Sequence, residues 1–170
     1  MIKNSLKHCV RPMVILFVLF QVLGGAFTTK AETEYSAKIK EAMTLMKDMA
    51  AKLGEPRADG ISLYFGTTKM NGNYEIVDSL KDQFGCTATF FVKKGDAFIR
   101  ISTNVLKEGN RAVGTKLDPN GPVIVAIQKG EVFYGVVDIL GSQYDTGYEP
   151  INNAAGELQG VYYIGYPLAK

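Results

Sequence analysis

Histidine and cysteine are nearly absent from this sequence, and tryptophan is missing altogether. The single histidine, His8, and the first of the two cysteines, Cys9, lie within the first 31 residues. The rest of the chain therefore has no histidine and one thiol, Cys86. A Ser-His-Asp triad, a Cys-His pair, a histidine-rich metal site and an intramolecular disulfide are excluded there. We expect a protein that is not an enzyme and holds no cofactor, with Cys86 as a small buried side chain.

The N-terminal segment has the composition of a cleavable secretion signal. Three basic residues come first, an apolar stretch follows over residues 13–27, and small residues precede the expected cut after Ala31. The apolar stretch is shorter than the roughly 20 residues that span a bilayer. We therefore expect residues 1–31 to be a signal peptide and the protein to be periplasmic or secreted. An uncleaved N-terminal membrane anchor is the alternative.

Positive charge is scarce once this segment is removed. The whole chain has 19 basic and 17 acidic residues, and the first 31 residues hold four of the basic ones and none of the acids. The remaining chain therefore carries a net charge of about −2. No basic stripe is left to neutralise phosphates, so nucleic acid is not an expected partner.

Residues 33–53 carry apolar side chains at three- and four-residue spacing, which predicts an amphipathic helix. Gly54 and Pro56 predict its end, and we assign residues 32–58 to this N-terminal helical region. The apolar face of the helix is expected to pack on the core of the domain. Pairing with a second copy in a homodimer is the alternative.

Alternation of apolar and polar residues predicts strands after Gly60, within a domain over residues 59–170. The segment 123–129 is ambiguous, because Pro122 and Gly130 fit the two ends of a helix while its β-branched residues fit a buried strand. Short connections favour an antiparallel meander, so the expected fold is an α+β domain with a five- to six-stranded antiparallel sheet and helices on one face. Strands are predicted over residues 61–65, 87–92, 97–103, 132–140, 143–151 and 158–166, and a short helix over 76–84.

Arg100 is the first candidate for a functional residue, because it interrupts the apolar strand over residues 97–103. Alternation places Arg100 and Ser102 on one face of this strand and Thr103 on the other. An arginine on a solvated face would be ordinary. One that faces inward must be paired, because the guanidinium cannot discharge itself by losing a proton. A ligand carboxylate would satisfy it with two parallel hydrogen bonds.

The second candidate is a strand face that carries Tyr144, Thr146 and Tyr148. Tyrosine offers an apolar wall with a polar tip, which is typical of small-ligand pockets, although the same residues also suit an ordinary sheet surface. Tyr134, in a neighbouring strand, is placed to face the same cavity.

Three further side chains complete the candidate site. Ser102 and Thr103 would add hydroxyl donors beside Arg100. Arg111 lies in a polar loop over residues 106–117, where it is either solvated or brought to a ligand when the loop closes over the sheet.

Five stretches of this sequence resemble the Cache 3/Cache 2 fusion domains of chemoreceptors, which are extracellular PAS-like sensors. They are residues 98–104, 109–115, 130–135, 144–151 and 156–165, and they occur in the order and with the gaps of that family. The resemblance implies a PAS-like antiparallel sheet behind a long N-terminal helix, with the segment 123–129 helical. It also implies a pocket between the sheet and its overlying loops and helices that binds a small organic acid in the periplasm.

The resemblance extends to citrate-sensing kinases, which carry more positive charge at the site. Arg100 is kept, whereas Thr103, Thr146 and Tyr148 stand where the kinases have a histidine or basic residues. This implies a ligand with one carboxylate, such as a short-chain or hydroxy acid. Because the chain stops at Lys170 without a further membrane helix or output domain, we expect action through a membrane receptor or sensor kinase, or simple carriage of the ligand. A protein-interaction module with a vestigial pocket is the alternative.

Overall fold

The computed structural model describes residues 35–169, so the expected signal peptide lies outside the described residues. The helices are α1 Ser36–Ala51, α2 Glu75–Phe84 and α3 Pro122–Gln128. The strands are β1 Pro56–Asp59, β2 Ser62–Phe65, β3 Thr68–Lys69, β4 Thr87–Lys94, β5 Ala97–Thr103, β6 Leu106–Lys107, β7 Asn110–Arg111, β8 Phe133–Ile139, β9 Ser142–Asn152 and β10 Leu158–Pro167.

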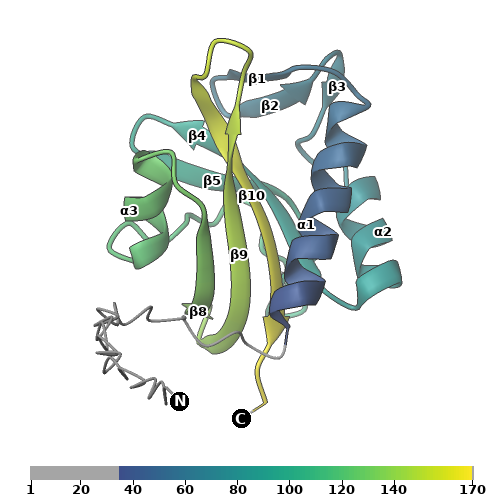
Figure 1. Cartoon of the computed structure of the whole chain (residues 1–170), viewed down its shortest axis with the longest axis vertical. Coiled ribbons are helices and arrows are strands. Elements are labelled where there is room, and N and C mark those ends of the chain that lie inside the picture. The colour runs from purple at the N-terminus through teal and green to yellow at the C-terminus, as the bar shows by residue number, and fades with distance from the viewer. Residues whose placement is uncertain (1–34, 170) are drawn as a thin grey trace, which may run out of the picture. The chain divides into compact units, whose positions relative to one another are not determined.

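The main sheet has five antiparallel strands in the order β5-β4-β10-β9-β8 (Figure 1). The β4–β5 hairpin and the β8–β9–β10 meander are two separate antiparallel units, and β10 joins them by pairing with β4. The expected meander of three consecutive strands over residues 132–166 is confirmed as β8–β9–β10, and so is the antiparallel α+β class. The last strand of the chain occupies the centre of the sheet.

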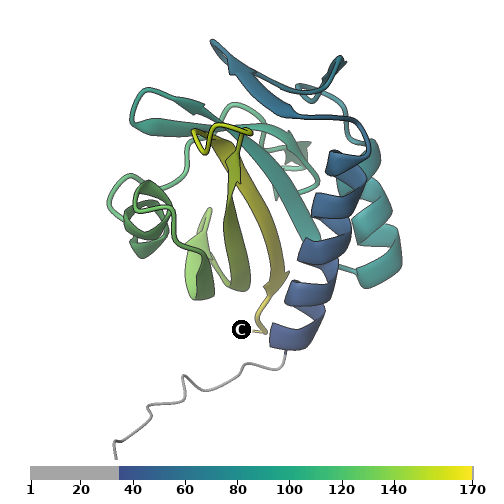
Figure 2. The same ribbon diagram turned by 45° about the horizontal axis from the view of Figure 1, so that its top comes forward.

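Helices cover both faces of this sheet. Figures 1 and 2 show α1 and α2 side by side against one face and α3 against the other. Each face carries its own buried apolar cluster. The expectation that helices lie on one face is therefore wrong, and the space under α3 is separated from the α1 side by the full thickness of the sheet.

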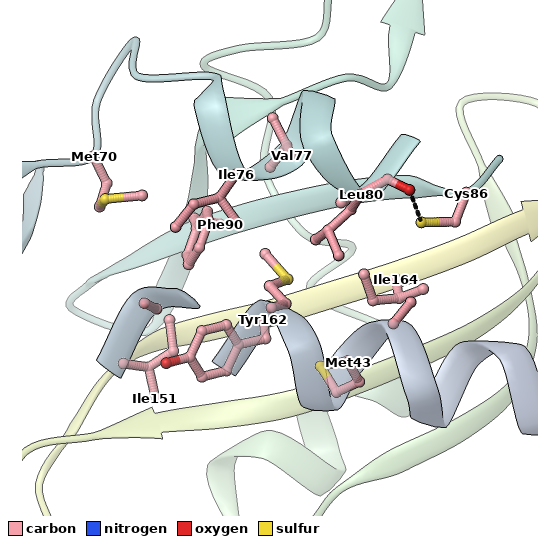
Figure 3. Close-up of a cluster of buried hydrophobic side chains, with 14 of the residues drawn as sticks. Met43, Met70, Ile76, Val77, Leu80, Cys86, Phe90, Ile151, Tyr162 and Ile164 are labelled. Carbon is pink, nitrogen blue, oxygen red and sulfur yellow. Dashed lines mark hydrogen bonds between the residues drawn. The ribbon is translucent and has the colours of Figure 1, made fainter. Parts of the chain in front are cut away.

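The apolar stripe of α1 lies on the core of the domain. Ile39, Met43 and Met46 are buried in the cluster between α1, α2 and the sheet, which Figure 3 shows in close-up. The helix begins at Ser36 and ends at Ala51, so the long N-terminal helix is not confirmed beyond that point. The last part of the region 32–58 forms β1 instead.

Cys86 belongs to the same cluster and is 1% exposed. Its thiol donates a hydrogen bond to the Leu80 carbonyl at 3.6 Å (Figure 3). Burial raises the pKa of Cys86 to about 11. The thiol is therefore protonated at neutral pH and serves as a small core side chain.

The ambiguous segment 123–129 is helical. Pro122 occupies the first helical position, and Gly130 adopts φ +75° just after the helix end. Val123, Ile124 and Ile127 are buried against the sheet. The β-branched residues are accepted in this helix because one side of it lies on the core.

Candidate ligand-binding site

A cavity of about 420 Å³ lies on the α3 side of the main sheet. Its wall is formed by side chains of β5, β8 and β9, by the β8–β9 hairpin, and by the segment from residue 116 to the first turn of α3. Arg100 and Tyr148 both line it. This volume suits a small organic ligand.

The backbone around Arg100 is fixed on both sides. β5 pairs with β4 on one edge, and the segment 114–117 covers its other edge through hydrogen bonds from Arg100 N to Thr115 O and from Gly114 N to Arg100 O. The guanidinium carbon lies 5.0 Å from the centre of the Phe91 ring. Nη1 donates to Thr115 Oγ1 at 2.7 Å. The side chain is thus held in one orientation before any ligand binds.

Arg100 is 4% exposed, and the described part of the chain supplies no counterion for its charge. Within residues 35–169, no carboxylate forms an ion pair with it, and its buried Nε has no hydrogen-bond partner. Burial lowers the pKa of Arg100, while the nearby Tyr148, Tyr163 and Tyr144 act in the opposite direction. The guanidinium stays charged because its ordinary pKa is so high. The cavity wall therefore contains a permanent buried cation.

Tyr148 supplies a neutral hydroxyl beside this cation. It is 2% exposed, and its ring contacts Phe133 and Tyr163 with centroids 6.3 Å and 4.9 Å apart. Burial raises the pKa of Tyr148, and Arg100 offsets part of that rise. In the described part of the chain its hydroxyl has no hydrogen-bond partner. A protonated phenol next to a guanidinium can donate to an anion.

The other two residues predicted with Tyr148 do not line the cavity. Tyr144 packs with it in the apolar cluster under α3, which confirms that the two share a face of β9. The Thr146 hydroxyl donates to the Gly135 carbonyl at 2.6 Å and so serves the sheet itself. Their assignment as ligand contacts is corrected accordingly.

A β-bulge at Ile101 overturns the predicted faces of Ser102 and Thr103. The β4–β5 pairing shifts by one residue between Arg100 and Ser102, so Ser102 faces the α2 side of the sheet. There its hydroxyl donates to the Asn73 carbonyl at 2.5 Å. Strict alternation, which placed Ser102 beside Arg100, is wrong across this bulge.

Thr103 is also occupied elsewhere. Its hydroxyl pairs with that of Thr89 at 2.6 Å, contacts the Ala88 carbonyl and accepts the Val105 N–H. Every hydrogen-bonding position of the group is filled by the protein. Thr103 does not line the cavity, so the structure gives no support to its predicted ligand contact.

Tyr134 lies on the face of the sheet opposite to Arg100. Its hydroxyl donates to Glu149 Oε1 at 2.6 Å, and Glu149 Oε2 accepts from Lys47 of α1 at 2.7 Å. The Tyr134 ring passes over Gly147, where a Cβ would come within 2.7 Å of it. The prediction that Tyr134 faces the cavity is wrong. Tyr134, Glu149 and Lys47 instead form a hydrogen-bonded cluster that connects α1 to β8 and β9.

Arg111 is already paired. Its two Nη atoms donate to the two carboxylate oxygens of Asp78 in α2, each at 2.8 Å, and Nη1 also donates to the Thr103 carbonyl. The guanidinium lies 4.2 Å from the centre of the Tyr74 ring. The structure therefore does not bring Arg111 to the cavity, and its contacts hold the β6–β7 hairpin on α2.

Replacing Arg111 with alanine is expected to lower the free energy of unfolding by about 1 kcal/mol, since a half-exposed bidentate pair contributes little more. Thermal denaturation measures this change, and Lys107→Ala on the same hairpin is the matched control. Affinity for carboxylates should stay the same. A loss of affinity as large as that of an Arg100 variant would contradict the assignment of Arg111 to Asp78.

Several residues that line the cavity or orient Arg100 carried no recognisable signal in the sequence. Thr115, which orients Arg100, lies in a loop 15 residues away from it. Leu117, Val123 and Ile139 line the cavity and read as ordinary core residues. Only the packing of α3 and its preceding loop on the sheet brings them to one place.

The architecture defines an α+β domain of PAS-like type, with a cavity between the sheet and an overlying helix and loop. The model of the Cache 3/Cache 2 fusion domain matches residues 23–170. The chain belongs to this family, whose members are extracellular small-molecule sensing modules. Comparison with curated proteins gives no match. Among residues 35–169, no helix has the length and hydropathy needed to cross a membrane.

Proposed function

We propose that this protein is a non-catalytic sensor that binds a small organic acid through one carboxylate in the cavity beside Arg100. The observation that carries the proposal is the buried guanidinium whose Nε has no partner and which lines the cavity. A buried charge of this kind is strongly unfavourable unless something neutralises it. A ligand carboxylate is the missing counterion.

The donors that remain free suit one carboxylate. Thr115 engages Nη1, and within residues 35–169 neither Nε nor Nη2 has a partner, so this edge can receive two carboxylate oxygens in parallel. The Tyr148 hydroxyl adds a third donor from the same wall. The other cation of the wall, Lys116, is exposed to solvent and contributes less.

The output of the sensor is part of the same proposal. Secretion through the N-terminal signal segment would bring the domain to the periplasm or the cell exterior. There it would act in trans on a membrane partner, such as a receptor or sensor kinase. Family membership supports a signalling role, and crosslinking in whole cells with and without acid would identify such a partner.

Calorimetry with a panel of monocarboxylic acids tests the binding site. The wild type is expected to bind, and Arg100→Ala should lose about 10- to 150-fold in affinity, the worth of a charge-assisted hydrogen bond. Arg57→Ala is the matched control, because Arg57 lies exposed on β1 and stacks on Tyr64. Equal binding by the wild type and Arg100→Ala would contradict the proposal. Specific capture of a partner protein without any acid binding would favour the interaction module instead.

A further inference from the structure

We infer that the ligand is an acid with an aliphatic or aromatic tail, and not a hydroxy acid or a dicarboxylate. This inference rests on the proposed function and names the part of the ligand that Arg100 does not touch. The cavity of about 420 Å³ is far larger than a carboxylate group alone requires. The rest of its wall therefore decides which acid fits.

The wall beyond Arg100 and Tyr148 is mainly aliphatic. Leu117 comes from the covering segment, Val123 from α3, and Val137 and Ile139 from β8. All four also belong to the apolar cluster on this side of the sheet. Three separate elements thus present hydrocarbon to the same space.

Hydroxyl groups that a polar ligand would need are already engaged. The hydroxyls of Ser102, Thr103 and Thr146 bond to other groups of the sheet, as described above, and Thr115 Oγ1 accepts from Arg100 and donates to the Ala112 carbonyl. Among the described residues, only Arg100 and Tyr148 offer buried hydrogen-bond donors to the cavity that the protein itself does not use. The ligand carboxylate requires both. A hydroxyl on the ligand's body would be buried without a partner.

The polar residues that line the cavity elsewhere lie toward solvent. These residues are Lys116, Asp118, Asp138 and Gln143, and all four are exposed. Leu140 also lines the cavity and is 45% exposed, so it marks the open side of the wall. A tail that extends from Arg100 along the aliphatic wall would reach Leu140 at the open side.

A homologous series of straight-chain acids from acetate to octanoate tests the inference by calorimetry on the full chain. Each methylene buried against the wall should improve affinity about fourfold, until the tail reaches solvent and the gain stops. The heat-capacity change of binding should become more negative along the same series. Hexanoate should bind at least about tenfold more tightly than 2-hydroxyhexanoate or adipate, which bury a group without a partner.

Two variants separate this inference from the proposed function. Val137→Thr keeps the shape of the wall but adds a hydroxyl, and it should weaken hexanoate more than acetate. Arg100→Ala should weaken all the acids by a similar factor. A flat series, or a preference for the hydroxylated or doubly charged acid, would overturn the aliphatic tail and leave the carboxylate site intact. Absence of any acid binding, or binding that Arg100→Ala does not weaken, would overturn the proposed function.

Discussion

Replacing Arg100 with methionine is expected to make the ligand-free protein more stable while it loses the ability to bind acids. Methionine has a similar length and is apolar, so it can occupy the space beside Phe91 and Tyr148 without a desolvated charge. Replacement of buried charged groups by apolar ones of similar volume is often neutral or stabilising by about 1–4 kcal/mol. Thr115 Oγ1 loses the hydrogen bond from Arg100 in this variant but still donates to the Ala112 carbonyl.

Urea denaturation of the wild type and Arg100→Met, with and without an acid, measures the free energy of unfolding of each protein and its change on binding. The wild type should gain stability from the acid by mass action, whereas the variant should gain none. Arg57→Met on exposed β1 is the matched control and should respond to the acid as the wild type does. A ligand-free Arg100→Met protein that is less stable than the wild type by about 2 kcal/mol or more would identify Arg100 as a structural residue.

Raising the pH above about 10 is expected to unfold the protein steeply. Tyr148, Tyr162, Tyr163 and Tyr166 are each less than a tenth exposed, and burial raises the pKa of all four, that of Tyr166 to about 12. In the unfolded chain tyrosines lose their protons near pH 10, whereas in the folded protein they keep them. Ionisation therefore favours the unfolded state, and stability that is complete below about pH 10 falls as the pH rises toward the folded pKa values.

The size of this effect follows from the number of buried phenols. Each contributes a loss of about 1.4 kcal/mol per pH unit between its unfolded and folded pKa. Circular dichroism and tyrosinate absorbance, recorded on the same samples, should change together, and Tyr148→Phe should make the transition less steep. Ionisation of all the tyrosines near pH 10 in a protein that remains folded would contradict the expectation.

Much of the fold could be predicted because local signals and packing agree. The strand expected over residues 97–103 is β5, and the helix expected over 76–84 is α2 with one more residue at its start. Periodicity alone did not resolve the segment 123–129. Its helical state depends on a buried face that only the assembled sheet provides, and the family resemblance was needed to predict it.

The site was predictable only where one residue carried the signal by itself. Arg100 stands out as a charge within an apolar strand, and Tyr148 shares the face that alternation assigned to it. The faces of Ser102 and Tyr134 depended on a bulge at Ile101 and on the register between β8 and β9, which a single sequence does not reveal. The pairing of Arg111 with Asp78 joins residues 33 apart and is invisible to local patterns.

Adjacent residues of β9 point to opposite sides of the sheet, so neighbouring side chains lie in the cavity wall and on the α1 side. Tyr148 forms part of the cavity wall, while Glu149 receives both Lys47 of α1 and Tyr134. The strand is pleated and closely packed between its neighbours, so a shift of Tyr148 toward a bound molecule would also displace the carboxylate behind it. Lys47 of α1 binds Glu149, and one peptide bond joins Glu149 to Tyr148 in the cavity wall. Helix α1 is therefore linked mechanically to the cavity across the sheet.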